Sequence, residues 1–195
     1  MFSKIKSNNS ILCEKALFTC LFFLILLIPT RGYAQDLNFE LIKAAQTGDT
    51  VAVKSLLVKG ADVNARDEIT NTALNCAIQS NKTDCVITLL DNGADVNEKN
   101  YGGYPPLVLA TCNGNIEVVK ALLEKGAEVN GRDPYDWTAL MNAVYLNNVE
   151  IVKILLDQGA DVNAKNYLGR SAMFIAESLG RKEIEPVLKE AGAKK

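Results

Sequence analysis

Four acidic residues recur at one fixed interval along the chain, and such a ladder of carboxylates could hold calcium ions. They are Asp62, Asp95, Glu128 and Asp161. Each stands in the same short phrase, Gly-Ala-Asp/Glu-Val-Asn, so the repeat itself accounts for them. The chain has no histidine, the commonest general base and a frequent metal ligand. We therefore expect a protein that is not an enzyme and that has no cofactor and no metal site.

Three cysteines lie beyond residue 35 and could supply thiol chemistry. Cys76 and Cys85 occupy apolar positions of the repeat, so we expect buried thiols, with a disulfide between them as the alternative. Cys112 occupies a more exposed position, where it could react or pair with another chain. Because three is an odd number, a disulfide scaffold is not expected.

Aromatic residues gather in the segments that precede each short helix and at the end of one such helix. Tyr, Trp and Arg carry much of the binding energy of protein interfaces, because they offer large, stiff contact areas with a polar group. We expect these residues to form one aromatic strip that binds a partner. The alternatives are that the rings only pack on neighbouring loops, or that they stack on a small molecule or glycan. The candidate residues are Tyr101, Tyr104, Tyr135, Trp137, Tyr145, Leu146, Tyr167 and Arg170.

The elements that position these side chains follow from the 33-residue period of the recurring phrase. The unit from Asp133 to Gly159 is typical. Thr138 is a natural N-cap for a short apolar helix over 139–144, and Asn147 suits the left-handed turn that follows. Apolar pairs spaced four apart predict a second helix over 149–157, which Gly159 ends. The polar segment that follows predicts a hairpin loop leading to the next unit.

Five such units account for the chain from about residue 38 to its end. The expected fold is an all-α repeat solenoid of stacked helix-turn-helix units with projecting β-hairpin loops. In the last unit Glu185 replaces an apolar residue of the second helix, as a water-facing cap requires. The first unit caps the other end, leaving three full units. The repeats are about 38–66, 67–99, 100–132, 133–165 and 166–195 within one domain over 35–195.

The phrase Thr138-Ala139-Leu140-Met141, the Gly or Asn turn, and the Leu-Leu-x-x-Gly-Ala-Asp-Val-Asn ending resemble the ankyrin repeat. The resemblance covers roughly residues 38–193. It implies paired antiparallel helices stacked into a curved slab, with hairpins along one edge. The family's Thr-Pro-Leu-His phrase is altered in every unit: its histidine is absent, and only Pro106 keeps the proline.

The segment 1–34 has the layout of a secretory signal peptide, with basic residues, the apolar run Ala16–Ile28, Pro29, and small residues before a cut after Ala34. The apolar run is short for a membrane span, which favours cleavage. An uncleaved membrane anchor is the alternative. Cleavage removes Lys4, Lys6, Lys15 and Arg31 together with Glu14, which moves the net charge from −2 to −5. This acidic balance gives no basic footprint for nucleic acid.

These observations together predict a non-enzymatic scaffold for protein–protein interaction in the cell envelope. We expect a periplasmic or secreted monomer that has no membrane contact after cleavage. It would bind an unidentified protein through its concave face and hairpin tips. Small-molecule or glycan binding on the aromatic strip is the alternative function.

Overall fold

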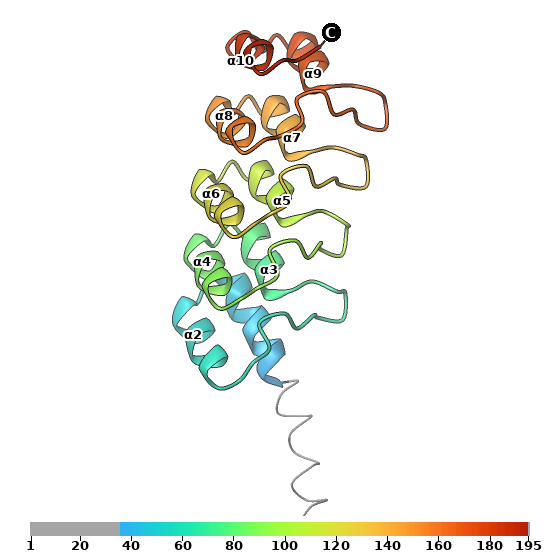
Figure 1. The fold of residues 1–195 in the computed structure, drawn as a ribbon. Helices are drawn as coiled ribbons and strands as arrows, with labels where there is room; N and C mark the ends of the chain where they lie inside the picture. The colour runs from blue at the N-terminus through green and yellow to red at the C-terminus, as the bar shows by residue number, and fades with distance from the viewer. Residues whose placement is uncertain (1–35, 195) are drawn as a thin grey trace, which may run out of the picture.

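The computed structural model describes residues 36–194 of the 195-residue chain. The predicted signal peptide, residues 1–34, lies outside this range. The described residues form a stack of helix pairs, each followed by a loop that projects to one side (Figure 1). The helices are a segment over 36–47, α2 (Thr50–Val58), α3 (Ala73–Gln79), α4 (Thr83–Asp91), α5 (Pro106–Cys112), α6 (Ile116–Glu124), α7 (Ala139–Tyr145), α8 (Val149–Asp157), α9 (Ala172–Leu179) and α10 (Ile184–Glu190).

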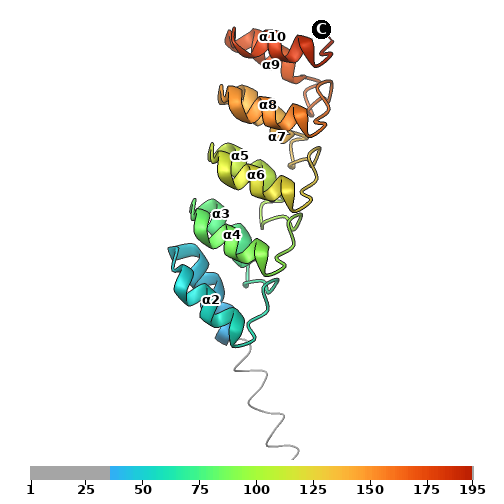
Figure 2. The same ribbon diagram turned by 60° about the vertical axis from the view of Figure 1, so that its left-hand side comes forward.

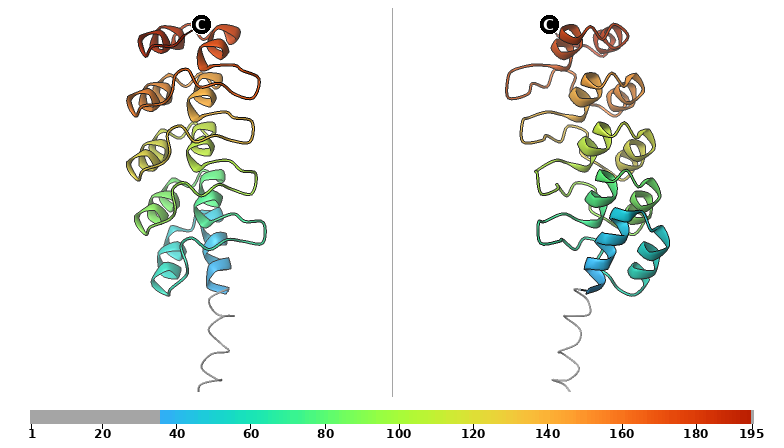
Figure 3. Two further views of the ribbon diagram at one scale, coloured as in Figure 1. Left: turned by 45° about the vertical axis from the view of Figure 1, so that its right-hand side comes forward. Right: turned by 180° about the vertical axis from the view of Figure 1, so that it is seen from behind.

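The helix pairs form two rows. The inner row, next to the loops, consists of helix 36–47, α3, α5, α7 and α9; α3 packs on α5, α5 on α7, and α7 on α9. The outer row consists of α2, α4, α6, α8 and α10, also packed in order. The layers follow one another with a gentle curvature (Figure 2), and the loops stay on one side of the stack in every view (Figure 3). The structure is therefore the predicted helical repeat solenoid.

Local sequence explains where the inner helices begin. The hydroxyl of Thr72 accepts a hydrogen bond from the backbone N–H of Asn75 at 3.2 Å, and Thr138 does the same for Met141 at 3.3 Å. Ser171 caps α9 in the same way. These side chains satisfy donors that a helix leaves free at its N-terminus. In α5 Pro106 takes the first helical position, where no N–H is needed.

The tight turn inside each unit needs a residue with positive φ. Asn81 and Asn147 adopt φ of 53° and 60° there, and glycine takes the same place in the other units. Asparagine tolerates this left-handed conformation better than most residues with a side chain. The predicted role of the turn position is confirmed in these units.

The core is built from residues that share a phase in the repeat. At two of these phases the inner helices all have a large apolar residue and an alanine, and the small alanine lets the two helices approach closely. At one phase the outer helices all have a leucine, which is fully buried in the units that have a neighbour on both sides. The inner residues are Leu41, Leu74, Leu107, Leu140 and Met173 with Ala44, Ala77, Ala110, Ala143 and Ala176, and the outer leucines of the two-sided units are Leu89, Leu122 and Leu155.

Polar substitutions close the two ends of the stack. Glu40 and Lys43 are exposed on the first helix, at the positions where the next unit buries Ala73 and Cys76. At the other end Lys189 is exposed on α10, while Leu188 remains buried against the preceding unit. The first unit therefore caps the stack with polar residues on its inner helix, and the last unit with a polar residue on its outer helix, as a repeat stack requires.

The projecting loops have the path of hairpins, but no strand forms in the part of the chain that the structure describes. Three loops close with a single antiparallel bridge each, between Arg66 and Thr72, Arg132 and Thr138, and Lys165 and Ser171. The loop at 99–105 shows no such bridge. Its closing residue is Pro105, which has no backbone N–H to donate.

The recurring asparagine of the Gly-Ala-Asp-Val-Asn phrase ties each unit to the next. The Oδ1 of Asn97 accepts from the N–H of Glu128 at 2.9 Å, and its amide donates to the Gly126 carbonyl at 3.4 Å. The same pair of bonds recurs one unit further along, from Asn130 to Asp161 and Gly159. The phrase is therefore a structural link between repeats.

The acids of the phrase have a structural role as well. The Oδ1 of each recurring Asp accepts from the N–H two residues later, for example Asp95 from Asn97 at 2.9 Å. Within residues 36–194 no group of three or more potential ligands is placed to hold a metal ion. The carboxylate ladder is accounted for as part of the repeat.

Candidate partner-binding surface

Each projecting loop is held in shape by one side chain at its start. The Oδ1 of Asp133 accepts from the N–H of Tyr135 at 2.8 Å and from that of Trp137 at 2.9 Å. Asn166 does the same for Leu168 and Arg170, both at 3.0 Å. Such Asx-type bonds fix the backbone of a turn locally. The candidate binding residues are therefore carried on pre-formed loops.

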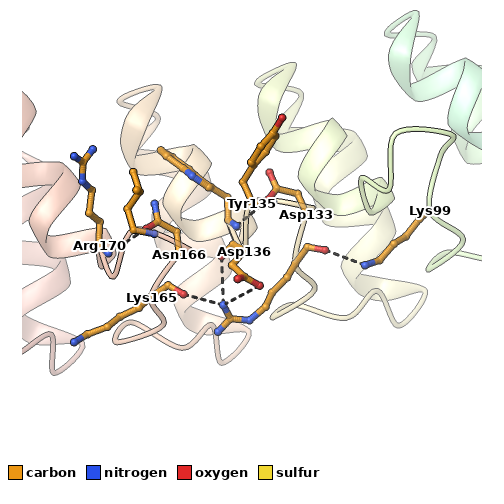
Figure 4. A network of polar contacts seen from close by, with 10 residues as sticks. Lys99, Asp133, Tyr135, Asp136, Lys165, Asn166 and Arg170 are labelled. Atoms are coloured by element: carbon orange, nitrogen blue, oxygen red, sulfur yellow. Dashed lines mark hydrogen bonds and ion pairs between the residues drawn. The ribbon is translucent and has the colours of Figure 1, made fainter.

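Hydrogen bonds join neighbouring loops along the stack. The Nζ of Lys99 donates to the Arg132 carbonyl at 3.0 Å, and the Nη1 of Arg132 donates to the Lys165 carbonyl at 2.9 Å (Figure 4). The same Nη1 lies 3.9 Å from the carboxylate of Asp136. Each of these loops is thus tied to the next at the same phase of the repeat. In Figure 4 Tyr135 and Arg170 extend on the side of the loops away from this network.

The structure brings four of the candidate aromatic residues together as two pairs. The rings of Tyr135 and Tyr167, from successive loops, have centroids 5.8 Å apart at a tilted angle of 50°. Trp137 meets Tyr145 edge-on, also at 5.8 Å and at 85°. Both geometries suit the ring quadrupoles. The single strip expected from the sequence is therefore resolved into paired rings on the third and fourth loops and the end of α7.

The remaining candidates differ in how far they are available to a partner. Tyr101 is 73% exposed at the second loop, whereas Tyr104 is half-buried against the core, as Trp137 is. Leu146 is exposed at the C-cap of α7. We call the exposed and half-buried rings of these repeats the aromatic surface. It comprises Tyr101, Tyr104, Tyr135, Trp137, Tyr145 and Tyr167.

Arg170 does not stand free. Its guanidinium lies 5.4 Å from the centre of the Phe174 ring, which is 48% exposed. This cation–π contact holds the guanidinium of Arg170 in one place. Phe174 was missed by the sequence analysis, although its phase gives a signal: Met141 is buried at the same position one unit earlier. Because Phe174 is exposed at a position that is buried in the preceding unit, it belongs with the candidate binding residues.

The missing histidines are replaced in different ways in different units. Asn75 is fully buried at that position and donates from Nδ2 to the Glu98 carbonyl at 3.1 Å, which gives one repeat a polar link. Val108 and Met141 fill the same place with apolar volume. The inner helices are therefore held by packing as well as by hydrogen bonds.

The three cysteines among the described residues are free thiols. Burial, with a smaller contribution from the charge of Asp67, raises the pKa of Cys76 to about 11. Burial and Asp133 also raise the pKa of Cys112, although its side chain is exposed and its Sγ lies 3.6 Å from the Oδ1 of Asn142. Cys76 and Cys85 are the predicted buried thiols, and the alternative disulfide between them is absent here.

Comparison with known proteins gives the family. A model of ankyrin repeats in three copies matches residues 41–133 and again 130–195, nearly all of the described chain. The chain belongs to the ankyrin-repeat family. Ankyrin repeats are generally protein–protein interaction modules, and the family is typically non-enzymatic.

Two bacterial relatives share shorter stretches with this ankyrin-repeat chain. It is 46% identical over 55 residues to the Rickettsia felis ankyrin repeat protein RF_pd14, covering 27% of this chain and 83% of the relative. It is 49% identical over 43 residues to RF_p14 of the same organism, covering 22% of this chain and 68% of the relative. Both matches are short enough to be carried by the repeat framework. The eight candidate binding residues therefore remain predictions.

Proposed function

We propose that this chain is an exported, non-enzymatic binding protein of the bacterial cell envelope that holds another protein on its aromatic surface. The observation that carries the proposal is the pairing of Trp137 with Tyr145 and of Tyr135 with Tyr167 on pre-formed loops. Three of these four rings remain exposed instead of being absorbed into the core. Rigid exposed aromatic residues bind with little loss of side-chain entropy.

The available area suits a protein partner. An aromatic side chain buries roughly 150–250 Å² when covered, and a standard interface takes about 800 Å² from each partner. The six rings of the aromatic surface, partly covered already, would supply about half of that area. Exposed Leu146, Leu168 and Phe174 lie in the same repeats and add to it.

The surface chemistry changes along the stack, which favours repeats three to five as the binding region. At the phase of Tyr104 and Trp137 the second unit has Asn71, which is 7% exposed and accepts from the backbone N–H of Tyr101 at 3.0 Å. At the phase of Tyr145 it has Gln79. The second unit thus has an asparagine that makes an internal link where the third and fourth units have Tyr104 and Trp137, and a glutamine where the fourth has Tyr145.

The envelope location rests on the sequence alone, since residues 1–34 lie outside the described part. No helix among the described residues is long and apolar enough to cross a membrane. We propose export to the periplasm or beyond with cleavage after Ala34, and retention of the segment as an anchor as the alternative. We also propose that the mature chain is monomeric.

The test is capture of envelope proteins on the mature chain, compared with the double variant Trp137→Ala/Tyr145→Ala. We expect the variant to lower the affinity of a specific partner at least about 10-fold, because two hot-spot rings are lost. Ile69→Ala is the matched control, since Ile69 is 56% exposed at the tip of the first loop, outside the aromatic surface. A partner that binds both variants like the native chain would show that the rings serve packing only.

Glycan binding remains the second candidate, because the edge-on pair Trp137–Tyr145 could stack against a sugar ring. A surface hollow of about 570 Å³ lies elsewhere, between Phe39 of the first unit and Ile69 of the second. A glycan array screened with the native chain and with the same double variant separates the two functions. Loss of a specific glycan signal in the variant, with no protein partner, would favour this candidate.

A further inference from the structure

Arg170 differs from the other arginines of the described chain because its side chain has no polar partner there. The other three, Arg66, Arg132 and Arg181, each donate to a carboxylate or to a backbone carbonyl. Within residues 36–194 the exposed guanidinium of Arg170 makes no hydrogen bond and no ion pair, and it contacts the Phe174 ring instead. A phenyl ring attracts the cation but offers no acceptor oxygen. The five N–H donors of Arg170 are therefore available to another molecule.

The acids of the last two units do not neutralise Arg170 by an ion pair within residues 36–194. Asp136 lies 3.9 Å from the Nη1 of Arg132, and Asp133 accepts two backbone N–H groups through its Oδ1. Glu177, the acid of α9, is exposed and forms no ion pair with Arg170. The loop side of these units is thus of mixed charge, with Arg170 as an exposed cation whose hydrogen-bond donors are unfilled.

Arg170 continues the row of candidate binding residues along the stack. It stands one repeat beyond Trp137 and two beyond Tyr104, at the same phase of the 33-residue period. Because α7 packs on α9, these successive positions are also neighbours in space. In Figure 4 Arg170 and Tyr135 extend on one side of the loops, and Lys165 extends on the other. A partner that covers the rings of the third and fourth units would meet the guanidinium next.

Phe174 orders the guanidinium at a position where the repeat does not require an exposed ring. The ring is 48% exposed, whereas Met141 is buried at the same phase one unit earlier. The guanidinium lies 5.4 Å from the centre of the ring. A long arginine side chain loses rotamer entropy when a partner fixes it, and a contact made beforehand lowers that cost. Binding at Arg170 therefore starts from a partly ordered side chain.

A single guanidinium suits a carboxylate better than a more highly charged group. It can donate two parallel N–H bonds to the two oxygens of one carboxylate, and the two charges then cancel. A phosphate monoester carries nearly two negative charges at neutral pH, so it needs a second cation. In the last unit Arg181 already donates to the Tyr145 carbonyl, and Lys165 lies on the other side of the loop. These observations favour a carboxylate as the group that Arg170 receives.

We propose that Arg170, held on the Phe174 ring, binds the carboxylate of an Asp or Glu side chain of the protein partner. Apolar residues of the partner flank this acid and cover Trp137 and Tyr145 in the neighbouring row. The mature chain is itself acidic, so a partner surface with many acids would be repelled. The proposal rests on the proposed function, because it names the chemistry of the segment that the aromatic surface holds.

The experiment selects random peptides displayed on phage for binding to the mature chain, residues 35–195. This part is self-contained, because its core runs from Leu37 to Leu188. We expect the selected peptides to share an Asp or Glu at one position, beside aromatic or aliphatic residues. Titration calorimetry with the synthetic peptides should show a loss of affinity of at least about 10-fold in Arg170→Ala, because a bidentate charged pair is removed.

A charge swap gives a readout that a merely structural role of Arg170 would not give. Arg170→Glu should lose the selected peptides, and a peptide whose acid is replaced by lysine should regain binding to Arg170→Glu. Lys165→Ala is the matched control, a basic residue of the same loop, and it should bind the peptides like the native chain. Both side chains are exposed, so these variants should keep the native Tm, which circular dichroism checks.

The outcomes separate this inference from the proposed function. Peptides that are lost in Trp137→Ala/Tyr145→Ala but not in Arg170→Ala, or that share no acid, overturn the inference and leave the aromatic surface as the binding site. Peptides that bind Trp137→Ala/Tyr145→Ala like the native chain contradict the proposed function instead. A native chain that enriches no peptide contradicts both. A dimer of the native chain that Arg170→Glu dissociates would assign the guanidinium to a second copy and also overturn the inference.

Discussion

Asn130 offers the sharpest test of how the repeats are joined, through the substitution Asn130→Ala. The change removes the 2.8 Å bond from the Asp161 N–H and the 3.4 Å bond to the Gly159 carbonyl. A net hydrogen bond contributes about 0.5–1.5 kcal/mol to stability. The second bond is long and the side chain is exposed, so the freed groups can reach water. We therefore expect the free energy of unfolding to fall by about 1 kcal/mol, the contribution of one such bond.

The matched control is Asn163→Ala, which removes the same two bonds at the end of the stack. Asn163 accepts from the Lys194 N–H at 2.8 Å and donates to the Gly192 carbonyl at 3.3 Å. These partners belong to the last turn of the chain, beyond α10. Losing them frays a terminus and does not uncouple two full repeats. The expected loss is below about 0.5 kcal/mol.

Urea unfolding followed by circular dichroism measures both losses, with the m-value as a check that unfolding remains two-state. For a domain of this size the expected drop in Tm for Asn130→Ala is about 2–4 °C. If Asn163→Ala costs as much as Asn130→Ala, the bonds act locally and do not couple repeats. If neither substitution changes stability, water replaces the asparagine bonds at no cost and the proposed link fails.

Two further predictions concern the core. Leu122→Ala should lower the free energy of unfolding by about 2–5 kcal/mol, because Leu122 is fully buried in the middle unit, whereas Leu122→Met should cost less than about 1.5 kcal/mol; calorimetry measures both. Burial raises the pKa of Cys76 from 9.0 to about 11, so the folded state favours the neutral thiol. The stabilisation from this group is complete below pH 9 and is lost as the pH rises to about 11. Urea titrations across that window should show the loss in the native chain and not in Cys76→Ala, and an identical pH profile in both would refute the assignment.

The helices and turns could be predicted from the sequence because each depends only on the position of a residue within the 33-residue repeat. The second helix of the third full unit was expected over 149–157, and α8 is Val149–Asp157. Asn147 was expected in the turn and has φ of 60°. In each case the residue type restricts the backbone, and neighbouring units repeat the restriction. Local preference and the global period agree, so the prediction needs no three-dimensional information.

The surface could not be predicted to the same depth because it depends on side-chain rotamers. The phase of Trp137 places it before α7, but only the structure shows that its ring lies against Tyr145. The contact of Arg170 with Phe174 likewise joins residues whose approach the period does not specify. The bridged hairpins lack strands because each closes with one bridge, a count that a polar loop sequence does not reveal.

The departures from the repeat divide the molecule into two regions with different chemistry. At the start of the stack, Val51 and Val58 stand on the outer row where later units have acids, and the second unit has no aromatic residue. In the later units the outer row keeps its acids, and the loop side carries the rings. If both features only reflected tolerance of surface change, they would be scattered among units and rows. Their separation, with one on each side of the stack and at opposite ends, keeps the outer face of α2 apart from the candidate binding residues.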